Sequence, residues 1–118
     1  MHALIIEDES LIAMLIEDSL RDCGFTSFDV AKSKDEAVAS AKRLCPNLIT
    51  ADVELNPGSG IDAVDEICSG PPIPVVFVTG SPSGVTARMP HHLMLLKPFE
   101  SQDLIAIVKV ALAGRADA

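Results

Sequence analysis

The sequence of 118 residues lacks the features that mark several large classes of protein. Its longest apolar runs are too short to cross a bilayer, so we expect no contact with a membrane. It has no cluster of lysine and arginine and a net charge of −8, which argues against direct nucleic-acid binding. The first residues, MHALIIEDES, have no basic segment and turn acidic at Glu7, unlike a secretory signal.

Cysteine is also scarce. Cys23, Cys45 and Cys68 are odd in number and widely spaced, and no metal-binding or redox spacing links them. We interpret them as buried thiols of a protein in the reducing cytoplasm.

The residues that are present support one compact domain. Hydrophobic residues make up 48% of the chain, which argues against disorder, and no internal linker is visible, so we expect a single domain over residues 1–118. Short apolar runs alternate with amphipathic segments. The pattern predicts strands over 3–6, 26–31, 48–51, 74–78 and 93–96, and helices over 10–24, 33–45, 60–68 and 101–114. This alternation is typical of an α/β fold with a doubly wound parallel sheet.

Two details of the helices can be read from the sequence. Ser10, Ser33 and Ser101 are suitable N-caps, and Ser33 has Glu36 at the spacing of a capping box. The segment GSPSGVTARMPHH, residues 80–92, contains two glycines and two prolines. We therefore expect the fourth helix, near residues 85–89, to be short or irregular.

Polar residues follow four of the predicted strands at their carboxyl ends. In a doubly wound parallel sheet, ligands bind at this edge. The residues there are Glu7, Asp8 and Glu9 after the first strand, Asp52 after the third, Thr79 after the fourth and Lys97 after the fifth.

Asp52 has two interpretations. Aspartate often begins turns, and the loop NPGSG follows directly. If the first and third strands are neighbours, however, Asp8 and Asp52 converge, and crowded carboxylates are stable around a hard cation such as Mg²⁺. A carboxylate beside that ion can act as nucleophile toward phosphorus. Lys97 and Thr79 would then supply a positive charge and a hydroxyl donor for an acyl phosphate on Asp52.

The whole chain resembles the receiver domain of two-component response regulators. The motifs that carry the resemblance are LIIEDE, LITADVELNPGSGIDA, PVVFVTG and LLKPF, in this order. The resemblance implies a flavodoxin-like (βα)5 fold with strand order 2-1-3-4-5, and a cis peptide between Lys97 and Pro98.

The resemblance also implies a role for each site residue. Asp52 would be the phosphoacceptor, and Thr79 and Lys97 would hold the phosphoryl oxygens. For Mg²⁺, Asp8 and Asp52 would be ligands, Glu7 would act through water, and Glu54 would contribute its main-chain carbonyl. The Glu54 side chain is open to three roles: an ion pair with Lys97, shielding of the acyl phosphate, or no role.

Within this family, ALIIEDESLIAMLIED and PGSGIDAV are similar to the receiver half of alphaproteobacterial general-stress regulators. Those regulators also carry a sigma-factor-like domain, which is missing here, so we expect a stand-alone receiver or one excised from a longer protein. Met94 is a departure, because receivers usually have an aromatic switch residue at that position, and this chain has no tyrosine or tryptophan. Signalling through the loop at 80–92 is the alternative hypothesis.

The resemblance implies a cytoplasmic signalling protein rather than an enzyme. A histidine kinase or a histidine phosphotransfer protein would donate the phosphoryl group and dock at the start of the first helix.

Apolar residues on the last helix outside its main stripe, Ile105, Val110 and Leu112, favour a homodimer or partner contact, with a broad core face as the alternative. His91 and His92 are interpreted as a solvated pair. Two other functions stay open: a fragment of a larger regulator, and an adaptor that binds proteins without phosphorylation.

Overall fold

The computed structural model describes residues 1–55, 58–70 and 72–116. Strands and helices alternate along these residues, as predicted. The elements are β1 (His2–Ile6), α1 (Ser10–Asp22), β2 (Ser27–Ala31), α2 (Lys34–Arg43), β3 (Leu48–Ala51), α3 (Gly60–Ile67), β4 (Val75–Thr79), α4 (Ser83–Arg88), β5 (Leu93–Leu96) and α5 (Ser101–Ala116).

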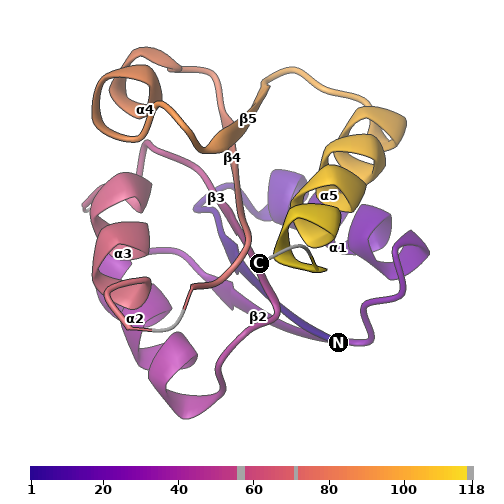
Figure 1. The fold of residues 1–118 in the computed structure, drawn as a ribbon, viewed down its shortest axis with the longest axis horizontal. Coiled ribbons are helices and arrows are strands. Elements are labelled where there is room, and N and C mark those ends of the chain that lie inside the picture. Colours follow the sequence, from indigo (N-terminus) through magenta and orange to yellow (C-terminus); the bar gives the residue numbers. More distant parts are fainter. Residues whose placement is uncertain (56–57, 71, 117–118) are drawn as a thin grey trace.

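The five strands form one parallel sheet in the order β2-β1-β3-β4-β5, which confirms the predicted fold. Helices α1 and α5 lie on one face of the sheet, and α2 and α3 lie on the other (Figure 1). β1 and β3 are neighbours, with Ile6 paired to Ala51. The residues that follow these two strands are therefore brought to the same point of the sheet edge.

The sheet separates two hydrophobic clusters, because successive side chains of a strand point to opposite faces. Every residue of β1, β3 and β4 is buried, as expected for strands covered on both sides. Toward α2 and α3 the cluster includes Leu4, Ile6, Ile49, Ala51, Ile61, Val64 and Phe77. Toward α1 and α5 it includes Ala3, Ile5, Ile16, Leu20, Leu48, Val76, Leu104 and Val108.

The helix ends agree with the sequence in part. Ser33 caps α2 as predicted, since its Oγ accepts a hydrogen bond from the amide of Glu36 at 3.2 Å. The predictions for Ser10 and Ser101 are wrong, because both are the first residues of their helices. The hydroxyl of Ser101 instead lies 2.6 Å from that of Ser19, which is buried on α1. A side chain that contacts another helix is not available to cap its own.

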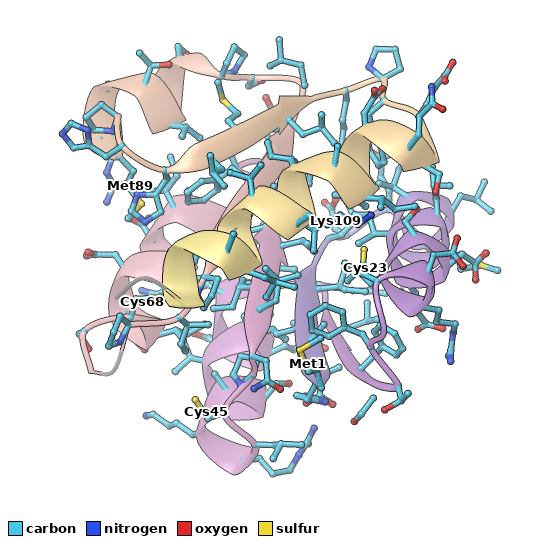
Figure 2. The ribbon with its side chains drawn as sticks, turned by 45° about the vertical axis from the view of Figure 1, so that its right-hand side comes forward. Met1, Cys23, Cys45, Cys68, Met89 and Lys109 are labelled. Atoms are coloured by element: carbon cyan, nitrogen blue, oxygen red, sulfur yellow. The ribbon has the colours of Figure 1, made fainter. Side chains whose placement is uncertain are left out.

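The fourth helix is short, as predicted, with six residues. The interpretation of the cysteines as buried thiols is wrong in part: Cys45 is exposed, and Cys23 and Cys68 are only partly buried. Figure 2 shows Cys23 near α1 and the other two on the opposite side of the molecule. Across the described residues, no helix is long and apolar enough to cross a membrane.

Thr50 in the middle of β3 is a source of instability inside the core. It is fully buried, and its hydroxyl has no hydrogen-bond partner among the described residues. Its register neighbours are Ile5 and Val76, both in the apolar cluster under α1 and α5. Thr50→Val keeps the branched shape and removes the unpaired hydroxyl. We expect it to raise the free energy of unfolding by about 1 kcal/mol.

Chemical denaturation of wild type and variant measures this difference. Thr86→Val on α4 is the control, because the Thr86 hydroxyl is exposed and donates to the Pro82 carbonyl at 3.2 Å. That control should not gain stability. A destabilised Thr50→Val would contradict the argument and point to a buried partner for the hydroxyl.

Candidate functional site

Carboxylates from two neighbouring loops meet at the carboxyl edge of the sheet. The amide of Asp52 donates to the carbonyl of Ile6 at 2.9 Å, so the parallel ladder of β1 and β3 runs up to the residue after each strand. Carboxylate oxygens of Glu7, Asp8, Glu9 and Asp52 all lie within 4.8 Å of one another. The predicted convergence of Asp8 and Asp52 is therefore what the fold produces.

The ammonium group of Lys97 lies among these acids. Its Nζ is 2.7 Å from Oε1 of Glu7 and 2.9 Å from Oδ2 of Asp52, and Oε1 of Glu9 lies 3.8 Å away. Lys97 is the residue after β5, the last strand of the sheet. A residue 45 positions from Asp52 in the sequence thus makes direct contact with its carboxylate.

Burial sets the protonation of this cluster. Glu7 is only 1% exposed, and this burial, together with the repulsion from Asp52, raises its pKa from 4.5 to about 7 despite the opposing hydrogen bond from Lys97. Burial lowers the pKa of Lys97, but its hydrogen bonds to Glu7 and Asp52 outweigh this effect and leave it above the ordinary value. The ammonium therefore stays charged, and one cation faces four carboxyl groups.

Asp52 begins a turn and also faces the acidic cluster. Its Oδ1 accepts a hydrogen bond from the amide of Glu54 at 3.2 Å, which is the geometry of an Asx turn. Its Oδ2 contacts Lys97. With an exposed fraction of 6%, the carboxylate is buried except where it lines a cavity.

Thr79 ends β4 and is completely buried. Its Oγ1 accepts a hydrogen bond from the amide of Ser81 at 3.0 Å, and its carbonyl accepts one from the amide of Lys97 at 2.9 Å. The hydroxyl keeps its own proton for a further acceptor. Thr79 is thus linked to Lys97 through the main chain.

A cavity of about 320 Å³ opens at the acids and is lined by Asp8, Glu9, Asp52, Glu54 and Leu55. The chemistry of this lining fits Mg²⁺, which prefers oxygen ligands and keeps several waters. The excess of carboxylates over the single ammonium of Lys97 also fits Mg²⁺. A cation in this cavity would offset the repulsion among the carboxylates that Lys97 alone does not compensate.

Glu54 does not contact Lys97 among the described residues, so an ion pair between them is not the role of this side chain. Glu54 is exposed, and its Oε1 instead accepts a hydrogen bond from the hydroxyl of Ser81. Ser81 lies on the loop after β4. The contact therefore joins the loop of Asp52 to the loop of Thr79.

Sequence reasoning missed Gly60, which holds the loop of Asp52 in place. A Cβ at Gly60 would lie 1.8 Å from the carbonyl oxygen of Asp52 and 2.8 Å from its carbonyl carbon. The amide of Gly60 also donates to the carbonyl of Val53 at 3.0 Å. The signal in the sequence was the second glycine of PGSG, but its spacing alone does not reveal a backbone contact.

The remaining predictions concern β5 and the loop before it. His91 and His92 are both exposed, as predicted for a solvated pair, but the His92 ring also lies against that of Phe77, with 5.7 Å between the ring centroids. Met94 is partly buried against the cluster under α2 and α3. The peptide between Lys97 and Pro98 is cis, as the resemblance implied.

The sequence of this chain matches a known protein family. The family described as "Response regulator receiver domain" matches residues 3–109. This chain belongs to that family. Receivers are signalling domains, and in this one the four clustered acids and Lys97 lie at the carboxyl edge of the sheet.

Individual relatives narrow the comparison. The receiver is 39% identical to the phyllosphere-induced regulator PhyR of Methylorubrum extorquens over 92% of this chain and 42% of the relative. It is 35% identical to the transcriptional regulatory protein PdtaR of Mycobacterium tuberculosis over 95% of this chain and 57% of the relative. The chain spans about half the length of these curated relatives.

Solved structures agree. The response regulator PhyR from Brucella abortus superposes with a TM-score of 0.90 at 37% identity, over 98% of this chain and 49% of that one. The PhyR receiver domain of Erythrobacter litoralis gives 0.87 at 33% identity, over 95% and 89%. These relatives confirm the similarity to alphaproteobacterial general-stress receivers that the sequence motifs indicated.

Proposed function

We propose that this receiver accepts a phosphoryl group on Asp52 from the phosphohistidine of a kinase or a phosphotransfer protein. The observation that carries the proposal is the position of the Asp52 carboxylate. It directly follows β3, the central strand of the sheet, contacts Lys97 at 2.9 Å and lines the acidic cavity. We also propose that residues 1–118 form one receiver domain that acts in the cytoplasm, where such donors are found.

In the proposed reaction a carboxylate oxygen of Asp52 attacks phosphorus. The new P–O bond makes an acyl phosphate as the bond from phosphorus to the histidine nitrogen breaks, and that nitrogen keeps the electron pair. The signal ends by hydrolysis of the acyl phosphate. Water attacks phosphorus, the P–O bond to Asp52 breaks, and inorganic phosphate leaves the restored carboxylate.

The neighbouring residues stabilise charge on the transferred group. Lys97 already contacts Asp52 and would move its hydrogen bonds to phosphoryl oxygens, and Thr79 would donate its free proton to another. Asp8, Asp52, the main-chain carbonyl of Glu54 and, through water, Glu7 would hold Mg²⁺. When bound, this ion neutralises the negative charge of the phosphoryl group.

The output of this receiver is proposed to be protein binding, and the chain is proposed to have no enzymatic activity beyond its own phosphorylation and dephosphorylation. Leu11 and Met14 at the start of α1 are 80% and 62% exposed and would meet the phosphodonor protein. On α5, Val110 is 58% exposed and would meet a second copy or an output partner, whereas Ile105 and Leu112 are half-buried and Leu112 packs against the core. Leu11 and Met14 are three residues apart on α1, so their side chains are neighbours on its surface.

Incubation with Mg²⁺ and acetyl phosphate tests the proposal. We expect intact-mass spectrometry to show the added mass of one phosphoryl group in wild type, and no such gain in Asp52→Ala or after chelation of Mg²⁺. Asp65→Ala is the matched control, because Asp65 is an exposed aspartate on α3. It should be phosphorylated like wild type.

A mass gain that persists in Asp52→Ala would place the phosphoryl group elsewhere and overturn the assignment. An unmodified wild type, with acetyl phosphate and with a phosphorylated phosphotransfer protein, would favour an adaptor that works without phosphorylation.

A further inference from the structure

A second cavity, of about 500 Å³, lies between the C-terminal ends of α2 and α3. Cys45 and Ile73, which both line it, come shortly before β3 and β4, so this cavity is at the amino edge of the sheet. Asp52 lies at the opposite edge, after β3. Figure 2 shows Cys45 well apart from Cys23, which ends α1. The proposed phosphoryl site therefore does not account for this cavity.

The base of this cavity is apolar. Ala41, Ile67 and Ile73 line it and pack against the buried cluster under α2 and α3. Val38 and Lys42 also line it, and their spacing from Ala41 and from each other puts all three on one face of α2. Cavities of this volume with apolar walls are typical of small-molecule sites. The space between the two helices can therefore take the apolar part of a small ligand.

Two charged side chains lie at the exposed rim of the cavity, Lys42 and Glu66. Oε1 of Glu66 is 3.7 Å from Nζ of Lys34, so its charge is partly compensated within the protein. Lys42, in contrast, forms no ion pair among the described residues. An ammonium without a protein partner beside an apolar surface complements a ligand with an apolar body and an anionic head. One ammonium suits a monoanion, because a dianion would leave a second charge facing Glu66.

We propose that this cavity binds a small amphipathic carboxylate, with its hydrocarbon chain on the apolar base between α2 and α3 and its carboxylate at Lys42. The inference goes beyond the proposed function and is independent of it. The lining shares no residue with the proposed phosphoacceptor and magnesium site.

A chain-length series measures how the cavity holds the ligand. Hexanoate, octanoate and decanoate are titrated into the isotope-labelled protein below the concentrations at which they form micelles, and amide NMR shifts report affinity and place. We expect shifts at the ends of α2 and α3 and at Ile73, and none at Asp52. The affinity should rise about two- to fourfold for each added methylene group that becomes buried.

The role of the carboxylate is measured with octanoate, octanol and octylammonium, which share one chain. Lys42→Gln should weaken octanoate binding about three- to fivefold at low salt and leave octanol binding unchanged. Octylammonium should bind wild type more weakly than octanoate does. Arg43→Gln is the matched control, because Arg43 lies in the same turn of α2, is not part of the lining, and pairs with Asp29 at 2.7 Å. It should bind octanoate like wild type.

A second pair of variants addresses the apolar base. Ala41→Leu places a larger side chain in the cavity and should weaken binding of octanoate and octanol alike, by about tenfold or more, because the added carbons occupy the space of the ligand. Ala39→Leu is the control, since Ala39 is exposed on the same helix and is not part of the lining. Thermal unfolding of both variants verifies that they fold.

Alkylation by iodoacetamide locates the ligand without any substitution. Cys45 is exposed and lines the cavity, whereas Cys23 is partly buried, and burial raises the pKa of its thiol. At ten times its dissociation constant, octanoate should slow alkylation of Cys45 by up to about tenfold, as the free protein becomes scarce. The rate at Cys23, beyond the sheet, should not change. Peptide mass spectrometry resolves the two thiols.

Several results would overturn the proposal. These are the absence of octanoate shifts at the cavity of the folded wild type, octylammonium that binds as tightly as octanoate, and binding that appears only with micelles. An unchanged octanoate affinity in Lys42→Gln would also overturn it, and would leave Lys42 as a cation that only complements the C-terminal end of α2. A dimer that Ala41→Leu disrupts, without octanoate binding, would assign the cavity to a second copy. None of these results bears on phosphorylation of Asp52, which is measured separately.

Discussion

Gly60→Ala is expected to lower the free energy of unfolding by about 3 kcal/mol, because a Cβ at Gly60 meets the closest contact of any glycine in the chain. The new Cβ would lie 1.8 Å from the carbonyl oxygen of Asp52, far inside contact distance. The obstacle is main chain at the end of β3, so no side-chain rotation relieves the clash. The loop of Asp52 or the start of α3 has to move.

Urea denaturation measures the loss, and acetyl phosphate measures its consequence. Because the displaced atoms belong to Asp52, phosphorylation should fall together with stability. Gly114→Ala is the control: a Cβ there meets no atom within 4 Å, and alanine in a helix is favoured over glycine by up to about 1 kcal/mol. An unaffected Gly60→Ala would show that the close approach of Gly60 to β3 is not a constraint on the fold.

Asp52→Asn is expected to have two opposite effects on stability. Without Mg²⁺ it should raise the free energy of unfolding by about 1 kcal/mol, because it removes one of four crowded carboxylates. The variant loses one contact with Lys97, but Lys97 keeps its 2.7 Å contact with Glu7. Relief of repulsion from Glu7, Asp8 and Glu9 therefore outweighs the lost attraction.

Mg²⁺ should reduce or reverse the difference in the free energy of unfolding between wild type and Asp52→Asn. Wild type should gain about 1.4 kcal/mol at a Mg²⁺ concentration ten times its dissociation constant, and Asp52→Asn should gain much less. Thermal unfolding with Mg²⁺ and with a chelator measures both differences. Asp65→Asn, an exposed aspartate on α3, should change neither. A destabilised Asp52→Asn with a normal Mg²⁺ response would remove the basis for a metal site at Asp52.

The sequence was sufficient for the architecture because the signals were local and repeated. β3 and β5 have the predicted bounds, and α2 begins after the predicted cap. Helices α1 and α5 begin at Ser10 and Ser101 rather than after them, because a serine that suits a cap also suits the first turn, and only the packing of α1 on α5 placed the Ser101 hydroxyl against Ser19.

The site could be predicted at the level of residue types at strand ends. In a parallel sheet the carboxyl ends share one edge, so the sequence alone makes Asp52, Thr79 and Lys97 candidates. The same reasoning left three roles for the Glu54 side chain, since a loop residue has no periodicity that fixes its direction. The structure directs it to Ser81.

The alternation of buried strands and amphipathic helices is thus encoded locally, and so is the edge at which the acids, the hydroxyl and the ammonium collect. The contacts among these groups are not: Lys97 meets Glu7 and Asp52, and Gly60 meets the Asp52 main chain, only in the folded chain. This is because hydrophobic periodicity is a signal between residues that are near in sequence. Ion pairs and backbone contacts instead depend on how segments that are distant in sequence pack together.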